Sequence, residues 1–234
     1  MTGTWINIIA VIIGGLLGKL LGAKLPERFR QTVVAGLGLF TASIGIQMFL
    51  KTENSIIVLG SLLLGVVIGE LAHLEDGIQS FGTVLERRIL GSSEGSGSRF
   101  VRGFLTASLL FCVGPMTILG SIQDGLSGDY SLLAIKAVLD GVAALAFAST
   151  LGIGVVFSVI IILIYQGGLT LLAAQVQSIV TPSMMNEMTA AGGVILVGIA
   201  ISSLLEIKKI RMGNFLPALI LAPVIVALLS YFGL

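Results

Sequence analysis

The chain has 234 residues, of which 56% are hydrophobic and 11% are charged, and its formal net charge is +1. Soluble domains carry about 25% charged residues, so a chain with a mean hydropathy of +1.08 has too little polar surface to face water on all sides. The composition therefore predicts a protein embedded in lipid. The near-neutral charge, without a basic stripe, argues against nucleic acid as a partner. The one cysteine excludes an internal disulfide.

The apolar segments predict an all-α polytopic membrane protein with about eight membrane-spanning helices, and seven is the alternative count. A helix needs about 20 apolar residues to cross a bilayer. We expect one integral membrane domain over residues 1–234, with the lipid bilayer as its main partner. The expected helices are Thr4–Ala23, Gln31–Leu50, Ser55–Leu71, Val101–Ile122, Ser131–Thr150, Val155–Ala174, Met188–Leu205 and Phe215–Phe232, with a loop at Gln175–Glu187.

The distribution of lysine and arginine predicts the orientation in the membrane. With eight spans and the N-terminus outside, every Lys and Arg except Lys51 and Lys136 lies at the inner side. Such a bias is typical of cytoplasmic loops. We therefore expect the N-terminus outside.

Residues 72–100 form the one long polar interval. Ile78, Phe81, Leu85 and Ile89 recur at helical spacing there, which predicts an amphipathic helix at the cytoplasmic membrane surface. The following stretch, Gly91–Ser98, has the composition of a flexible linker. The interval separates two membrane halves.

Faint matches between the first three and the last three helices suggest an inverted repeat, as many transporters have. Gly14-Gly15-Leu16 is similar to Gly167-Gly168-Leu169, and a proline follows each triplet. The identities are few, and Gly/Leu-rich helices also match by chance, so the sequence leaves the repeat open.

Glycines spaced four apart lie on one face of several helices and predict close helix packing. The glycines of the first and third helices are Gly14, Gly18, Gly22, Gly65 and Gly69. Such faces also fit contacts between subunits, so we expect a homo-oligomer.

A lysine and an aspartate lie within the span Ser131–Thr150. Lys136 and Asp140 are four residues apart and share one helix face. A charge at that depth is costly in lipid, about 3 kcal/mol. One interpretation is a buried structural ion pair. The other is a cation or proton site, with Asp140 as the acid and Lys136 as an internal counter-charge.

The segment before this pair holds the other candidate pathway residues. Gly114-Pro115 breaks the helix Val101–Ile122 and frees carbonyl groups, which fits either a packed kink or a pathway. Gln123, Asp124 and Asp129 are expected in an acidic outer loop, and Gln47 adds a polar group in the second helix. Gln166 and Glu187 are further polar groups expected to cross-link helices.

Four stretches of the chain are similar to a known family: Phe111 to Gly120, Gln123-Asp124-Gly125, Lys136 to Gly141, and Asn186 to Gly193. They resemble the YdfK/YqgA family of bacterial inner-membrane proteins, domain of unknown function 554. The resemblance covers nearly the whole chain. It implies a multi-pass protein of the bacterial plasma membrane, and it implies no substrate and no site residues.

The sequence favours a secondary transporter or channel for a small ion or solute, with candidate pathway residues Asp140, Lys136, Asp124, Gln123, Gly114, Pro115 and Gln47. The sequence contains no Walker-type loop, so we do not expect ATP to be the energy source. We expect no cofactor, no metal and no catalytic activity. The alternative is a non-transporting scaffold or sensor that docks a partner through residues 72–100.

Overall fold

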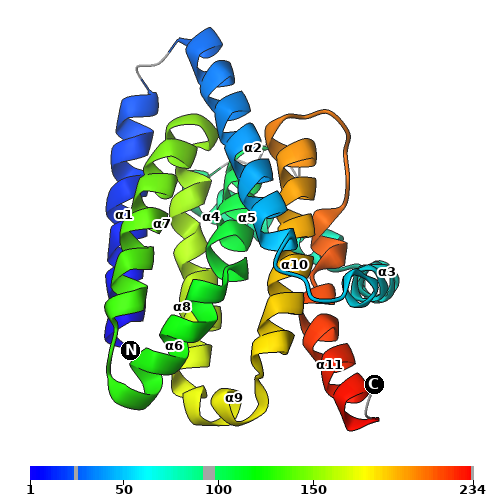
Figure 1. The fold of residues 1–234 in the computed structure, drawn as a ribbon. Helices are drawn as coiled ribbons and strands as arrows, with labels where there is room; N and C mark the ends of the chain where they lie inside the picture. The colour runs from blue at the N-terminus through cyan, green and yellow to red at the C-terminus, as the bar shows by residue number, and fades with distance from the viewer. Residues whose placement is uncertain (24–25, 92–97, 233–234) are drawn as a thin grey trace. The chain divides into compact units, whose positions relative to one another are not determined.

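The computed structural model describes residues 1–23, 26–91 and 98–232, which are helical apart from turns and contain no strand. The α-helices, labelled in Figure 1, are α1 (Thr2–Gly22), α2 (Glu27–Phe49), α3 (Ser55–Leu71), α4 (Leu74–Leu90), α5 (Arg99–Val113), α6 (Pro115–Ser127), α7 (Ser131–Leu151), α8 (Val159–Leu171), α9 (Ala173–Ile179), α10 (Pro182–Ile199) and α11 (Ala218–Tyr231). Two 3-10 segments, η1 (Ile153–Ser158) and η3 (Met212–Phe215), and one π-helical segment, η2 (Ala200–Leu204), accompany them.

The prediction of an all-helical membrane protein is confirmed. Among the described residues, 6 helices are long and apolar enough to cross a membrane, and the number rises to 8 if each of two bent helix pairs forms one span. The pairs are α3 with α4, bent by 59°, and α5 with α6, bent by 62°.

The structure differs from the sequence prediction at one of the two expected loops, and most of the other lies outside the described residues. The loop expected at Gln175–Glu187 is largely helical, because α9 ends at Ile179 and α10 begins at Pro182. Pro182 takes the first position of α10, where its missing N–H costs nothing, and the Thr181 hydroxyl caps the helix. Residues 74–90 form the helix α4, whereas most of the expected linker, residues 92–97, lies outside the described residues.

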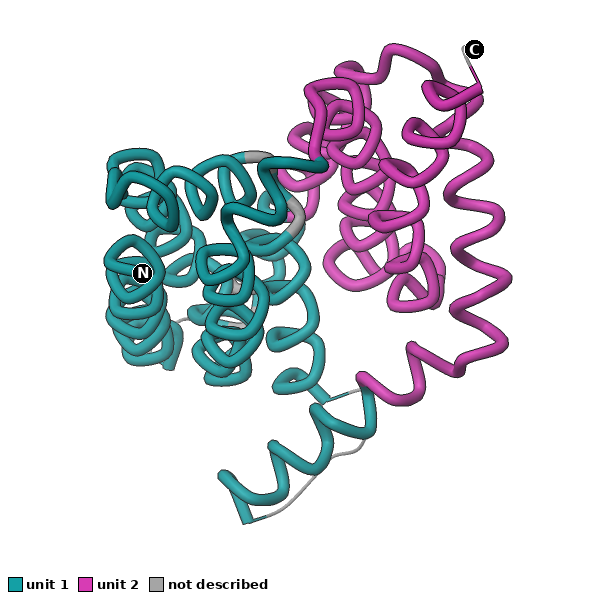
Figure 2. The backbone as a smooth tube through the Cα atoms, turned by 90° about the horizontal axis from the view of Figure 1, so that it is seen from below, with its two compact units in different colours: residues 1–37, 79–179 teal, residues 38–78, 180–234 magenta. Residues whose placement is uncertain are grey.

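The chain divides into two compact units that interleave along the sequence (Figure 2). Unit 1 consists of Met1–Leu37 and Gln79–Ile179, and unit 2 consists of Gly38–Ile78 and Val180–Leu234. The units are therefore not the first and second halves of the chain. The helices α2 and α4 each contribute residues to both units.

In unit 1, α1 lies against α7 along its whole glycine face (Figure 1). A Cβ atom added at Gly14, Gly18 or Gly22 would strike the backbone carbonyl of Gly141, Leu145 or Ser149, respectively. The glycines thus allow two backbones to approach without side chains between them. The residue numbers of the contacting positions increase together along both helices, so α1 and α7 run parallel.

The parallel pair limits the number of membrane crossings. If α1 and α7 both span the membrane, an odd number of crossings must separate them. One of these crossings is α2, so the two bent pairs either both cross or both turn back. With α8, α10 and α11 each crossing, the described residues then form six or eight spans.

The break between α5 and α6 falls at Gly114, which has an extended backbone with φ −75° and ψ 147°. The Thr117 hydroxyl donates to the Phe111 carbonyl over 3.0 Å, and the Thr117 N–H donates to the Gly114 carbonyl over 3.0 Å. The break is therefore stabilised by hydrogen bonds that replace part of the interrupted helix ladder.

In unit 2, the glycine face of α3 also packs within the chain. Gly65 lies against Ala218 at the start of α11, and Gly69 lies against the backbone of Asn214 in η3. Both glycine faces named from the sequence are thus occupied inside their own units. They give no separate reason for a second copy of the chain, and the homo-oligomer stays a prediction.

Candidate functional site

An ion pair is buried near the middle of α7. Lys136 Nζ contacts Asp140 Oδ2, and the two residues are only 5% and 8% exposed. They lie one helical turn apart on the face that α7 turns toward the rest of unit 1. Two charges are therefore removed from solvent within a helix long enough to span a membrane, where an unpaired charge would be costly.

A second helix supplies the other partner of this carboxylate. Asn7 of α1 is fully buried, and its Nδ2 donates to Asp140 Oδ2 and to Gln166 Oε1, each over 3.0 Å. Both partners are acceptors, so the amide nitrogen of Asn7 has to face them. Its other atom, Oδ1, is buried and has no hydrogen-bond partner among the described residues.

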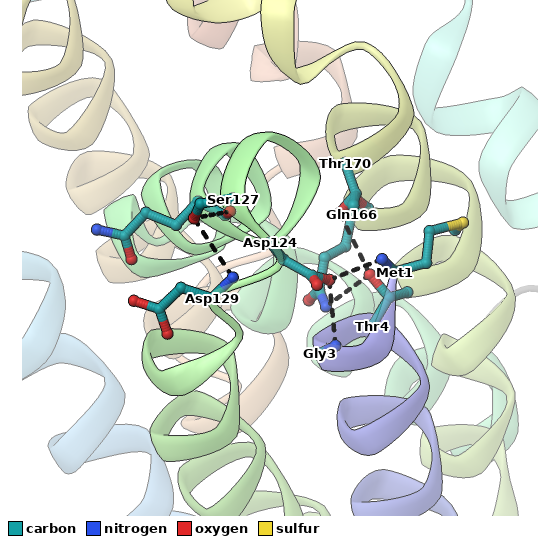
Figure 3. Close-up of polar contacts among 9 residues, drawn as sticks. Met1, Gly3, Thr4, Asp124, Ser127, Asp129, Gln166 and Thr170 are labelled. Carbon is teal, nitrogen blue, oxygen red and sulfur yellow. Dashed lines mark hydrogen bonds and ion pairs between the residues drawn. The ribbon is translucent and has the colours of Figure 1, made fainter.

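Hydrogen bonds continue from Gln166 toward the first turn of α1 (Figure 3). Gln166 Nε2 donates to Thr4 Oγ1 over 3.2 Å, and Thr4 Oγ1 lies 3.4 Å from Thr170 Oγ1. The hydroxyl of Thr170 donates to the Gln166 carbonyl over 2.9 Å. Three helices, α1, α7 and α8, thus contribute to one buried polar network, which we call the α7 network: Thr4, Asn7, Lys136, Asp140, Gln166 and Thr170.

Asp124 lies beside the start of α1 in the same unit. Its Oδ2 accepts from the Gly3 N–H over 3.1 Å and lies 3.2 Å from the amino group of Met1 (Figure 3). The N-terminal turn of a helix has unpaired N–H groups and a partial positive charge, so a carboxylate is stabilising there. Asp124 therefore closes one end of α1.

The position of Asp124 differs from the expected acidic outer loop. The helix α6 continues to Ser127 and turns the Asp124 side chain inward, leaving it 4% exposed. Gln123 and Asp129 are exposed. Hydrogen bonds from the Ser131 hydroxyl and backbone N–H hold the pKa of Asp129 below its ordinary value of 3.8.

The remaining predicted pathway residues lie elsewhere. Gly114 and Pro115 form the break between α5 and α6, within unit 1. Gln47 is exposed and belongs to unit 2. Thr4, Asn7 and Thr170 were not among the residues predicted from the sequence. The signal for them was Asn7, a polar residue within an apolar helix that shares one helix face with Gly3 and Thr4.

Unit 2 holds a different buried acid, Glu187 of α10, which is 1% exposed. Its carboxylate accepts from Thr52 Oγ1 over 2.6 Å and from the N–H groups of Glu53 and Asn54 over 2.7 and 2.9 Å. These donors immediately precede α3. Glu187 therefore fixes the turn that leads into α3, and we call this group the α3 clamp: Thr52, Glu53, Asn54 and Glu187.

The neighbouring acid, Glu53, is fully exposed and faces the start of α10. Its carboxylate accepts from Asn186 Nδ2 over 2.7 Å and from Ser183 Oγ over 2.8 Å. These hydrogen bonds, with that from Asn186 first in size, hold the pKa of Glu53 below its ordinary value of 4.5. Glu187 of α10 thus accepts hydrogen bonds from the turn before α3, and Glu53 of this turn accepts hydrogen bonds from α10.

The chemistry of the α7 network is that of a single carboxylate surrounded by neutral amide and hydroxyl groups. Among the described residues, no group of three or more His, Cys, Asp and Glu side chains is placed so that it could hold a metal ion. The network can hold one positive charge within a span, a position taken by the Lys136 ammonium.

The long apolar helices and the buried charges between them define a multi-pass membrane protein. The family model described as "Protein of unknown function (DUF554)" matches residues 2–227, and the chain belongs to this family. The chain is 36% identical to the "Uncharacterized protein YqgA" of Escherichia coli (strain K12) over 94% of both chains. It is 29% identical to the "Uncharacterized membrane protein YdfK" of Bacillus subtilis (strain 168) over 100% of this chain and 99% of the relative. No solved structure matches the chain.

Proposed function

We propose that the protein is a secondary transporter or channel for a small ion or solute in the bacterial inner membrane. It is not driven by ATP and has no catalytic activity of its own. The observation that supports this most directly is the Lys136–Asp140 pair, buried within a span and joined to two other helices. Ionisable residues inside membrane spans typically mark ion and substrate pathways.

The surroundings of the pair also fit transport. The broken helix α5/α6 belongs to the same unit as the α7 network. Broken helices and charged groups near the middle of spans are common at transporter binding sites. The row of polar side chains from Thr4 to Asp140 leads from the first turn of α1 to the middle of α7.

The test is a flux measurement in proteoliposomes with a panel of labelled ions and solutes. Asp140→Asn removes the charge and keeps the shape, and we expect it to reduce flux by at least about tenfold, as for loss of the charged group of a pathway. Asp129→Asn removes an exposed acid of the same unit and serves as the matched control. Equal flux of wild type and Asp140→Asn for every transported species would refute the role of Asp140, and the absence of flux for every species in the panel would refute transport.

A second function is supported by the exposed apolar side chains of α4, which include Phe81, Val84 and Leu90. A scaffold or sensor that docks a partner through residues 72–100 would use this surface. Deleting residues 76–98 distinguishes the two functions. Loss of a co-purifying partner with intact flux would assign the segment to docking, whereas unchanged partners would reject the scaffold.

A further inference from the structure

Resting on the proposed function, we infer that Asp140 and Asn7 form a binding site for a monovalent alkali cation, with Na⁺ as its representative, and that the Lys136 ammonium competes with this cation for Asp140. The inference is carried by a buried carboxylate that accepts from an asparagine, Asn7, whose amide oxygen is buried without a partner among the described residues.

The amide oxygen of Asn7 is the first step. Buried polar atoms nearly always have a hydrogen-bond partner, because leaving one without a partner costs free energy. Asn7 Oδ1 is buried without a partner among the described residues, and its amide cannot be reversed, since Nδ2 already donates to two acceptors. This oxygen is therefore available to a group that brings positive charge.

The donor set indicates the class of that group. Carboxylate, amide and hydroxyl oxygens are ligands for hard cations rather than for soft transition metals. At this site they are the carboxylate of Asp140 and the amide oxygen of Asn7, whereas Gln166 Oε1 and Thr4 Oγ1 already accept from the amide nitrogens of Asn7 and Gln166. Asp140 is the one acid of the α7 network, so it balances one positive charge, and a divalent ion would leave an excess charge within the span.

Lys136 supplies the competition. Its ammonium contacts the same Asp140 oxygen, Oδ2, to which Asn7 donates. A lysine ammonium is a point charge on a flexible four-carbon stem, so it can give up this position without a backbone movement. Asp140 then exchanges one positive partner for another. In one state the Lys136 ammonium binds Asp140, and in the other state the cation binds it. The cation thus binds only one of the two states, and such a difference in affinity is what a ligand needs to shift a conformational equilibrium.

The competition predicts an uncommon mutant phenotype. A purely structural ion pair, on losing its lysine, leaves a buried charge that no particular salt repairs. A cation site, on losing its competitor, binds the cation more tightly. Lys136→Ala should therefore bind Na⁺ at least about tenfold more tightly than wild type, which corresponds to a binding free energy about 1.4 kcal/mol more favourable.

The experiment measures thermal unfolding of the detergent-purified chain in NaCl, LiCl, KCl and choline chloride at equal ionic strength. We expect an alkali cation to raise the unfolding temperature of wild type relative to choline, and to raise that of Lys136→Ala at lower concentrations. Lys136→Ala combined with Asp140→Asn carries no charge at the site and should show no difference between salts. Gln177→Ala, at an exposed position of unit 1, should behave as wild type.

Asn7→Ala tests the second ligand and does not depend on the recovery of folded Lys136→Ala. It removes the Asn7 Oδ1 oxygen. We therefore expect that the alkali cation concentration needed for a given rise in unfolding temperature is at least about tenfold higher than in wild type. Identical unfolding of wild type in alkali and choline salts would overturn the inference, as would equal cation effects in wild type and Asp140→Asn.

The outcome is distinguishable from failure of the proposed function. Flux that depends on Asp140 but is unaffected by alkali cations, and is driven by a proton gradient alone, would leave a transporter and overturn the cation site. Cation binding that depends on Asp140, without flux of any species in the panel, would support the site and refute transport.

Discussion

Two acids that are almost fully buried, Glu187 in unit 2 and Asp140 in unit 1, have different kinds of partner. Glu187 accepts from two backbone N–H groups and a hydroxyl just before α3. Asp140 is bound by the side chains of Lys136 and Asn7, which lie within α7 and α1. Helix ends leave N–H groups that need acceptors, whereas the backbone within a helix is already paired. The α3 clamp therefore pairs N–H groups at a helix end, whereas the α7 network joins side chains of three helices.

The largest expected effect on stability follows from breaking the α3 clamp. Glu187→Ala removes the acceptor of three donors, of which the Asn54 N–H alone keeps another acceptor, Thr52 Oγ1, and we expect it to reduce the free energy of unfolding by about 3 kcal/mol. Glu187→Gln keeps one acceptor oxygen and should lose less. Unfolding in detergent measures the loss. Flux per folded molecule should remain that of wild type, and a flux defect of the folded variant would place function in unit 2 as well.

A smaller effect is expected where α1 meets α7. Gly14→Leu places a side chain against the Gly141 carbonyl and should cost about 2 kcal/mol, as overpacking does. Because α1 carries Asn7, this change should also reduce flux. Gly36→Leu is the matched control, since a Cβ atom at Gly36 meets nothing within 4 Å. Equal stability of the two variants would contradict the close parallel packing.

The smallest effect concerns Glu53 at the surface of unit 2. Its pKa is below the ordinary value of 4.5 in the folded protein, so its contribution to stability is present above that value and is lost as the pH falls through the lowered pKa. Glu53→Gln should therefore weaken the decrease in unfolding temperature between about pH 6 and about pH 3.5. Asp129→Asn is the corresponding variant in unit 1. A Glu53→Gln profile that follows wild type throughout would rule out this contribution.

The parts of the fold that the sequence predicts are those that depend on local pattern. The apolar runs indicate the spans, Gly114-Pro115 indicates the break between α5 and α6, and the four-residue spacing places Lys136 and Asp140 on one face. Each of these signals lies within a few neighbouring residues, where helix geometry alone decides the outcome.

The parts that the sequence does not predict depend on which helices become neighbours. Asn7 and Asp140 are separated by 133 positions, and no local pattern brings α1 beside α7. Asp124 was expected to face solvent because its own segment is polar, yet the start of α1 provides the donors that allow it to be buried. The interleaving of the two units likewise follows from long-range contacts.

That interleaving has a consequence for how the protein is made. Gly65 and Gly69 of α3 pack against Ala218 and Asn214, about 150 residues later in the chain. A ribosome adds about 5–20 residues per second, so roughly 8–30 s pass between the synthesis of the two surfaces. During that time the glycine face of α3 has to be covered by lipid or by the insertion machinery. Unit 2 begins with the second helix of the chain, and its packing is completed only after the last helix has been synthesised.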